Sequence, residues 1–159
     1  MMNVNFIAMG KLKEGYFREA CAEYQKRLSA FARVTLKEPP PEDLPQNPSP
    51  AQIEKALEKE AALIREQAKS GFNIALCVEG KELSSEQLAQ KLESLGTGGV
   101  STVSFIIGSS FGLAESLKRG CDFRLSMSPM TFPHSLARVM LFEQVYRAFS
   151  ILNNSKYHK

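Results

Sequence analysis

Cysteine, strong net charge and long apolar runs are all scarce in this sequence of 159 residues. Its three cysteines, Cys21, Cys77 and Cys121, form no CxxC pair and leave one over, which argues against a disulfide framework and against a zinc site. No apolar run approaches the ~20 residues that a membrane span needs. The residues from Met1 to Phe6 lack the basic start of a secretory signal. We therefore expect a cytoplasmic protein with no metal site and no membrane segment.

The net charge is only +3, but it is unevenly distributed along the chain. Residues 1–110 hold 13 Lys and Arg against 14 Asp and Glu, whereas residues 111–159 hold 7 against 3. A basic C-terminal part suits a polyanion partner such as RNA, and it also suits an ordinary solvated surface. The charge pattern alone leaves both interpretations open.

Length and composition predict one globular domain that spans residues 1–159, with 43% hydrophobic and 23% charged residues. The hydrophobic pattern alternates strands and helices five times along the chain. This alternation predicts an α/β fold with a largely parallel sheet and helices on both sides. The expected strands are 2–9, 33–38, 73–79, 102–107 and 123–126, and the expected helices are 15–32, 50–71, 84–96, 113–119 and 133–152.

Two of these elements are unusually apolar. The strand at 73–79 is a near-continuous apolar run, which is typical of a strand that is covered on both faces. The last helix has apolar side chains around more than one face, so we expect it to need a partner besides the sheet. Self-association through this helix is the simplest interpretation.

Proline and capping residues mark the connections. Six prolines lie between Pro39 and Pro50, which predicts a long, extended surface segment. This segment ends in a capping signal, with Ser49 as the N-cap and Gln52 three residues later. Ser84 and Gln87 repeat the same spacing before the next helix.

Ligands of parallel sheets bind at the carboxyl ends of the strands, so the loops after Val78, Ile107 and Leu125 are the candidates for a site. The second loop reads Gly108-Ser109-Ser110-Phe111-Gly112, which matches the G-x-S-x-G pattern of serine hydrolases. Asp122 and His134 would complete a triad with Ser110. However, Asp122 precedes its strand and lies at the opposite edge of the sheet, roughly 15 Å away. We therefore expect a loop that approaches a ligand through its backbone.

The third loop, Ser126 to His134, contains two prolines and small polar residues. It predicts either a plain helix start with Thr131 as the cap, or a rigid loop whose backbone recognises a small ligand. His134 stands alone near the helix start, where a structural role is the commoner one.

The second half of the chain contains one long, specific pattern. It consists of Phe105-Ile106-Ile107-Gly108-x-x-x-Gly112, Leu125-Ser126-x-Ser128-x-Met130-Thr131-x-Pro133-His134-x-Leu136-x-Arg138-Val139, Glu143-Gln144-x-Tyr146-Arg147-Ala148 and Tyr157-His158. With Gly10-Lys11, the Pro-rich segment and Gly80-Lys81, it resembles the RlmH family over essentially the whole chain. These are small SPOUT-class methyltransferases that act on 23S ribosomal RNA.

The resemblance implies a parallel-sheet SPOUT methyltransferase fold with a C-terminal deep trefoil knot, and a homodimer. It also implies that S-adenosyl-L-methionine is the cofactor and that N3 of pseudouridine 1915, in helix 69 of 23S rRNA, is methylated within the assembled ribosome. The cofactor contacts implied by the family are Leu76, Gly108, Met127, Ser128, Pro129, Met130, Thr131 and Phe132. The family usually has a second glycine where this chain has Ser109, whose Cβ could crowd the cofactor or require a negative φ.

The resemblance also makes Arg138, Arg147, Tyr157 and His158 the candidate catalytic residues. The two arginines are nine positions apart on one helix and point about 180° from each other, so they cannot serve one site of one subunit. Tyr157 and His158 are candidate contacts to an unstacked RNA base. The alternative is that this terminal segment is frayed and solvated.

Two other functions stay open at this point. A non-enzymatic ribosome-associated or RNA-binding protein would share the basic C-terminal part without binding the cofactor. A different SPOUT methyltransferase would bind the cofactor and modify another target.

Overall fold

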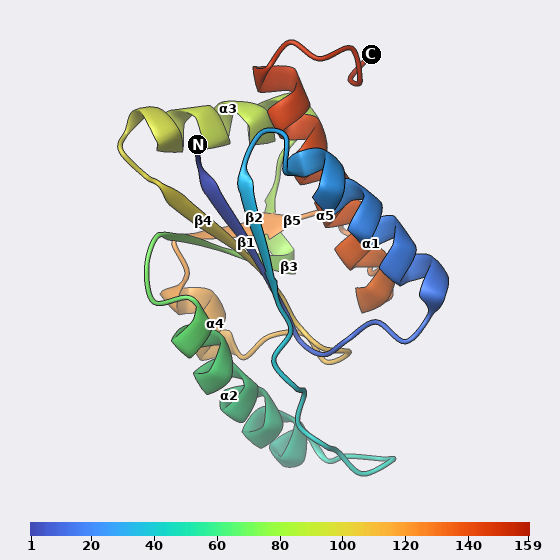
Figure 1. Cartoon of the computed structure of the whole chain (residues 1–159). Helices are drawn as coiled ribbons and strands as arrows, with labels where there is room; N and C mark the ends of the chain where they lie inside the picture. Colours follow the sequence, from blue (N-terminus) through green and yellow to red (C-terminus); the bar gives the residue numbers. More distant parts are fainter.

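Five parallel strands form a single sheet in the computed structural model, which describes residues 1–159 (Figure 1). The strands are β1 (Asn3–Ala8), β2 (Arg33–Lys37), β3 (Phe72–Glu82), β4 (Thr102–Ile107) and β5 (Phe123–Ser126), in the order β2-β1-β4-β3-β5. The helices are α1 (Gly15–Leu28), α2 (Pro50–Gln67), α3 (Ser85–Thr97), α4 (Glu115–Gly120) and α5 (His134–Leu152). The predicted α/β class and the parallel sheet are confirmed.

Alternation along β1 explains why the sheet is covered on both faces. Val4, Phe6 and Ala8 point into a core of 20 buried residues shared with α1, α3 and α5. Ile7 and Met9 point the other way, into a smaller core of 10 buried residues shared with α2 and α4. Figure 1 shows the two helical layers on opposite sides of the sheet. Because successive side chains of β1 point to opposite faces of the sheet, this one strand contributes to both cores.

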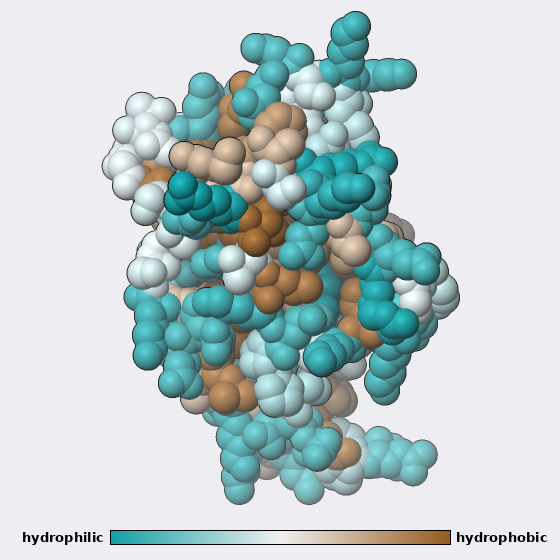
Figure 2. All heavy atoms as spheres, in the orientation of Figure 1, coloured by the Kyte–Doolittle hydropathy of each residue, from teal (hydrophilic) through white to brown (hydrophobic).

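Helix α5 is covered within its own chain. It packs against α1 and α3, and its side chains Leu141, Phe142, Val145 and Ala148 are buried. The apolar surface around more than one face is thus occupied by two neighbouring helices. Leu136 nevertheless remains 37% exposed and Met140 is half-buried, so part of the apolar surface is open, and self-association through α5 stays a prediction. The face shown in Figure 2 is mainly hydrophilic, with hydrophobic side chains in small separate patches.

Strand β3 is longer than expected and less buried. Ile74 and Ala75 are buried, but Val78 is 46% exposed, so the prediction of a strand covered on both faces is wrong for its second half. The reason is a register shift, because Leu125 of β5 pairs first with Leu76 and again with Lys81. The segment between these two pairs arcs past β5 instead of lying flat in the sheet.

Gly80 makes this arc possible. A Cβ at Gly80 would lie 2.8 Å from the backbone of Arg124 and Leu125, a distance that real side chains do not tolerate. The close approach holds the arc against β5 and leaves Cys77 to Glu79 beside the carboxyl ends of the strands. These residues consequently reach the site described below.

Both predicted helix starts are confirmed. The Ser49 side chain accepts a hydrogen bond from the backbone N–H of Gln52, and the Ser84 side chain accepts one from that of Gln87. Each glutamine side chain in turn accepts a hydrogen bond from the backbone N–H of its serine. The helix ends differ from the prediction. Helix α2 ends at Gln67, and Gly71 with φ +96° forms the turn into β3, where a Cβ would meet the carbonyl of Thr102. Helix α3 continues through Gly96 to Thr97.

Candidate functional site

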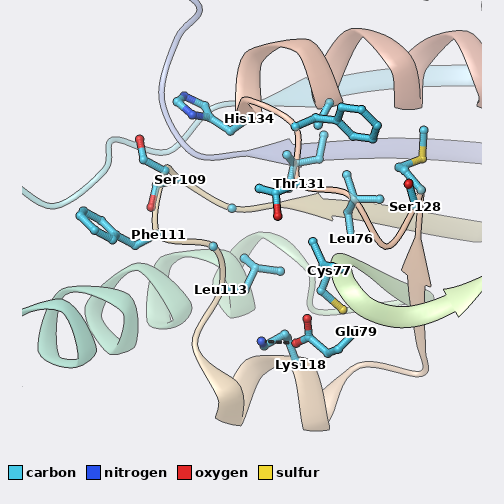
Figure 3. Close-up of a pocket in the computed structure, with 18 of the residues that line it drawn as sticks. Leu76, Cys77, Glu79, Ser109, Phe111, Leu113, Lys118, Ser128, Thr131 and His134 are labelled. Carbon is cyan, nitrogen blue, oxygen red and sulfur yellow. Dashed lines mark hydrogen bonds and ion pairs between the residues drawn. The ribbon is translucent and has the colours of Figure 1, made fainter. Parts of the chain in front are cut away.

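The loops after β4 and β5 and the arc of β3 that ends at Glu79 line a cavity of about 340 Å³, within the usual range for small-molecule sites (Figure 3). The prediction that the loops after Ile107 and Leu125 meet at a site is confirmed, whereas the third wall belongs to strand β3 itself and not to a loop. Of the eight residues that the family resemblance assigned to the cofactor, seven line this cavity: Leu76, Gly108, Met127, Ser128, Met130, Thr131 and Phe132. Pro129 is the exception and is not part of the lining.

The loop after β4 is a closed backbone turn. The N–H of Gly112 donates to the carbonyl of Ser109 at 2.9 Å, and Gly112 has φ +82°. A Cβ at Gly108 would lie 2.3 Å from the carbonyl oxygen of Gly112. Only glycine fits at that position, so this wall of the cavity presents bare backbone to a ligand.

Ser109 is accommodated without backbone strain. Its φ is not positive, and its hydroxyl donates to Oε1 of Glu60 in α2 at 3.0 Å. Glu60 is only 4% exposed, and its Oε2 accepts the backbone N–H of Glu42 in the Pro-rich segment at 2.9 Å. A buried carboxylate therefore ties the glycine loop to α2 and to the Pro-rich segment, at the position where the family usually has glycine.

Short polar side chains hold the loop after β5. The hydroxyl of Ser126 donates to the carbonyl of Ser128 at 3.0 Å, and the N–H of Met130 donates to the hydroxyl of Ser128 at 3.0 Å. Thr131 does not cap α5, since the residue before that helix is Pro133 and no side chain caps it. Thr131 lines the cavity instead, which favours the rigid recognition loop over the plain helix start.

An ion pair that the sequence pattern did not reveal lies in the same cavity. Lys118 of α4 pairs with Glu79 of β3 and, at 3.2 Å, with Glu115 (Figure 3). The hydrogen bond from Lys118 lowers the pKa of Glu79. Burial opposes the charge on Lys118, but its bonds to Glu79 and Glu115 raise the lysine pKa overall. The cavity therefore contains a stable positive and negative pair. Its partners come from distant parts of the chain, so no local motif announces it.

Arg138 does not face the cavity. It is 2% exposed, pairs with Glu38 at 2.7 Å and donates to the carbonyls of Gly10 at 2.8 Å and Met9 at 3.3 Å. Its guanidinium thus ties α5 to the segments that follow β1 and β2. This placement favours a structural role, and the assignment of Arg138 to catalysis stays an untested prediction.

Arg147, Tyr157 and His158 lie together at the other end of α5. Arg147 pairs with Glu143, and the Tyr157 hydroxyl donates to the same carboxylate at 3.1 Å. Nδ1 of His158 accepts from Arg147 at 3.2 Å, and its Nε2 contacts Glu86 of α3 at 2.7 Å. Burial raises the pKa of Tyr157 to about 12, with bonds to Tyr24 and Glu143 acting in the same direction. The terminal segment is anchored by these contacts, and the alternative of a frayed tail is not supported.

This C-terminal cluster is far from the cavity of its own chain. Arg147 follows Ala137, the last residue of α5 that lines the cavity, by ten residues, about 15 Å along the helix axis. None of Arg147, Tyr157 and His158 lines the cavity. The structure therefore divides the candidate residues into a cavity group and a C-terminal group.

The serine hydrolase alternative finds no triad. Asp122 accepts the backbone N–H of Asn73 at 2.8 Å, at the amino end of β3, whereas Ser110 follows the carboxyl end of β4.

The side chains also form no group of three His, Cys, Asp or Glu residues that could hold a metal ion. None of the five helices combines the length and hydropathy that crossing a bilayer requires.

Known proteins resemble this chain over nearly its whole length. A family model described as "Predicted SPOUT methyltransferase" matches residues 2–158. Two curated relatives, from Alkaliphilus oremlandii and Carboxydothermus hydrogenoformans, are 45% and 44% identical over 159 residues. The alignment covers 99% of this chain and 100% of each relative. Both are named ribosomal RNA large subunit methyltransferase H.

Solved structures share the fold at low identity. A tRNA (m1G37) methyltransferase from Aquifex aeolicus is 14% identical with a TM-score of 0.53, and the match covers 91% of this chain and 69% of the other. A "Probable Methyltransferase" from Bordetella pertussis Tohama I is 16% identical with a TM-score of 0.56, covering 93% and 95%. These likenesses concern the fold alone.

Proposed function

Because this chain belongs to the SPOUT methyltransferases, and within them to the family of ribosomal RNA large subunit methyltransferase H, we propose that it methylates N3 of pseudouridine 1915 of 23S rRNA. Membership of an enzyme family speaks against the non-enzymatic alternative. We propose further that the substrate is the assembled ribosome, which places the activity in the cytoplasm. The single observation that supports this function best is the cavity whose lining contains seven of the eight residues that the family resemblance indicates.

We infer that the methyl donor is S-adenosyl-L-methionine and that it occupies this cavity. The residues fit such a molecule, because Gly108 has no room for a side chain and leaves the backbone open to close approach. About half of the lining is apolar, and its polar groups include Ser128, Thr131, His134 and the Glu79–Lys118 pair. Leu76 and the loop from Met127 to Phe132 would hold the cofactor, which supplies an activated methyl group on a sulfonium. The chain's own task is then to position the acceptor nitrogen in line and to exclude water.

We propose that the active form is a homodimer. The C-terminal cluster begins about 15 Å along α5 from Ala137, which lines the cavity of its own chain. If Arg147, Tyr157 and His158 contact the RNA base at the methyl donor, a second chain has to bring them there. Val139 and Met140 of α5, with Leu83 and Leu125, line a groove of about 470 Å³ beside β5 that a second copy could occupy.

The trefoil knot is also a proposal. Leu125 of β5 pairs with both Leu76 and Lys81, so β5 ends inside the arc that β3 makes around it. A chain that leaves β5 through this arc and continues into α5 would be threaded. Such threading is almost absent from other folds.

The decisive experiment uses ribosomes that lack the modification. We expect the protein with labelled S-adenosyl-L-methionine to label 23S rRNA of these ribosomes, and the label to map to N3 of pseudouridine 1915. Ribosomes that already have the methyl group are the control and should take up no label. Label at another nucleotide would indicate a different SPOUT target. No separate RNA-binding module is present, so we expect specificity to need the preformed RNA surface of the ribosome. If free 23S RNA is labelled as well as assembled ribosomes are, the assembled ribosome is not the required substrate.

A further inference from the structure

A second cavity lies directly beside the cofactor cavity. It measures about 610 Å³, and the segment after β1, the Pro-rich segment and the start of α5 line it. Four residues belong to both linings and form the wall between them: Ser109, Ser110, Phe111 and His134. Figure 3 shows Ser109, Phe111 and His134 together at one end of the cofactor cavity, away from the Glu79–Lys118 pair.

The acceptor base has to lie against the methyl donor, so it needs a space that adjoins the cofactor cavity. The groove beside β5 shares only Met127 with that cavity, whereas the second cavity shares a wall of four residues. The Phe111 side chain is 47% exposed at this wall and offers a flat face for stacking. Lys11 and Lys13 are exposed at the rim and can pair with flanking phosphates.

His134 is the one histidine on the shared wall, and its ring nitrogens are available to a ligand. No hydrogen bond connects its ring to the rest of the chain, whereas both ring nitrogens of His158 contact other side chains. Burial lowers the pKa of His134, and the positive charge of Arg138 on the same helix lowers it further. Glu14 before α1 acts in the opposite direction. The other charged groups around the cavity are Lys11, Lys13, Glu42 and Glu60.

The other candidate bases are less suitable. Both carboxylate oxygens of Glu60 already accept hydrogen bonds, from Ser109 and from the backbone of Glu42. Tyr157, with a pKa of about 12, remains protonated at neutral pH. An efficient general base has a pKa near the working pH, a condition that an imidazole meets.

We propose that the second cavity holds the acceptor nucleotide and that His134 takes the proton from its imide nitrogen during methyl transfer. This inference rests on the proposed function. His134 accepts the N3 proton on its free ring nitrogen while the nitrogen lone pair forms the bond to the methyl carbon. The carbon–sulfur bond breaks, its electron pair stays on sulfur, and S-adenosylhomocysteine leaves uncharged. The imidazolium then releases its proton to water.

The test compares wild type with His134→Gln in single-turnover methylation of unmodified ribosomes between pH 5.5 and 9. For wild type, the rate should rise about tenfold per pH unit below the pKa of His134 and level off above it. For His134→Gln, the rate at pH 7 should fall by about a hundredfold to ten-thousandfold. Its profile should also lose the plateau and keep rising with pH, because hydroxide then has to remove the imide proton.

Two further readouts do not depend on turnover. The chain has only two histidines, so proton NMR of the protein alone resolves both, and His158→Gln assigns them. The His134 signal should titrate below 6.5, the ordinary value for histidine. His134 also borders the cofactor cavity, so calorimetry is needed to separate the two roles. Glutamine keeps a polar side chain of similar size there, and we expect wild type and His134→Gln to bind S-adenosyl-L-methionine with the same affinity.

The outcomes separate the two proposals. If wild type methylates ribosomes and His134→Gln does so at the same rate, the base assignment is wrong and the proposed function stands. A loss of cofactor affinity in parallel with the rate would assign His134 to cofactor binding and contradict its role as base. If wild type labels no RNA at all, the proposed function itself fails.

The placement of the acceptor nucleotide in the second cavity has its own test. The double variant Lys11→Ala, Lys13→Ala should raise the KM for ribosomes, whereas Lys26→Ala, on an exposed part of α1, should leave it unchanged.

Discussion

At the level of single residues, the cofactor cavity depends on Gly108, where main-chain atoms and no side chain line the cavity. Gly108 and Gly112 lie so close that a methyl group on the first would overlap the carbonyl of the second. The position of a Cβ is fixed by the backbone and the carbonyl oxygen belongs to it, so no side-chain rotation can relieve the overlap. The turn would have to open, and the cavity would change shape with it.

We therefore expect Gly108→Ala to weaken the binding of S-adenosyl-L-methionine by about ten- to hundredfold, the equivalent of roughly 1–3 kcal/mol of backbone strain. Calorimetry measures this affinity directly. Gly120→Ala is the matched control, because a Cβ at Gly120 meets no atom within 4 Å and its φ is not positive. Unchanged affinity in Gly108→Ala would mean that the cofactor does not use this turn.

Glu60 shows a residue whose role no local pattern announces. In the sequence it is one of several charged positions in a long helix, and such a residue is usually solvated. In the structure it is buried, and its two oxygens join the glycine loop to the Pro-rich segment. Burying a carboxylate is costly unless it accepts hydrogen bonds, and both of its oxygens do. Ser109 thus replaces the usual glycine and gains a specific partner.

At the scale of elements, the helix starts are determined locally. The capping boxes at Ser49 and Ser84 follow from four consecutive residues each, and both form as predicted. Helix α3 then packs against α5, whose start borders both cavities. A weaker cap on α3 should therefore reduce stability while the cavity at the other end of α5 remains intact.

Ser84→Ala should lower the free energy of unfolding by about 1 kcal/mol, because the N–H of Gln87 loses its acceptor. Ser94→Ala, at an exposed position inside the same helix, should be neutral or slightly stabilising, since alanine is the better helix former. Urea denaturation of the two variants measures the difference. Equal stability of the two would show that the capping bond contributes nothing net.

At the scale of the whole molecule, α5 separates the candidate residues into two groups. Its start borders the cofactor cavity, and its end packs with Tyr157 and Arg147 in the C-terminal cluster. Within one chain, α5 holds Arg147 about 15 Å from Ala137, the last residue of this helix in the cavity lining. Two chains can bring both groups to the same ligand, if each presents its tail to the cavity of the other.

Mixing two inactive variants tests this arrangement. Gly108→Ala damages the cavity and Arg147→Ala damages the C-terminal cluster, and each alone should methylate poorly. After mixing and reassociation, half of the dimers contain one chain of each kind, and one of their two sites has both parts intact. We therefore expect about a quarter of wild-type activity to return. If no activity returns although light scattering shows dimers, each site lies within one chain.

Local sequence patterns were sufficient to predict most elements and the edge of the sheet at which the site lies. Strands β4 and β5 match their predicted residues, because hydrophobic alternation and turn residues act over a few positions. The carboxyl ends of parallel strands share one edge, so the loops after β4 and β5 had to converge there.

The strand order, the ion pair of Glu79 with Lys118 and the burial of Arg138 became evident from the folded chain alone. The folded chain also shows that α1 and α3 cover α5, and that His134 stands unpaired between two cavities. Each of these depends on residues that are distant in the chain. Their contacts arise only when the whole core packs, and the free energy of that packing is not encoded in any short stretch.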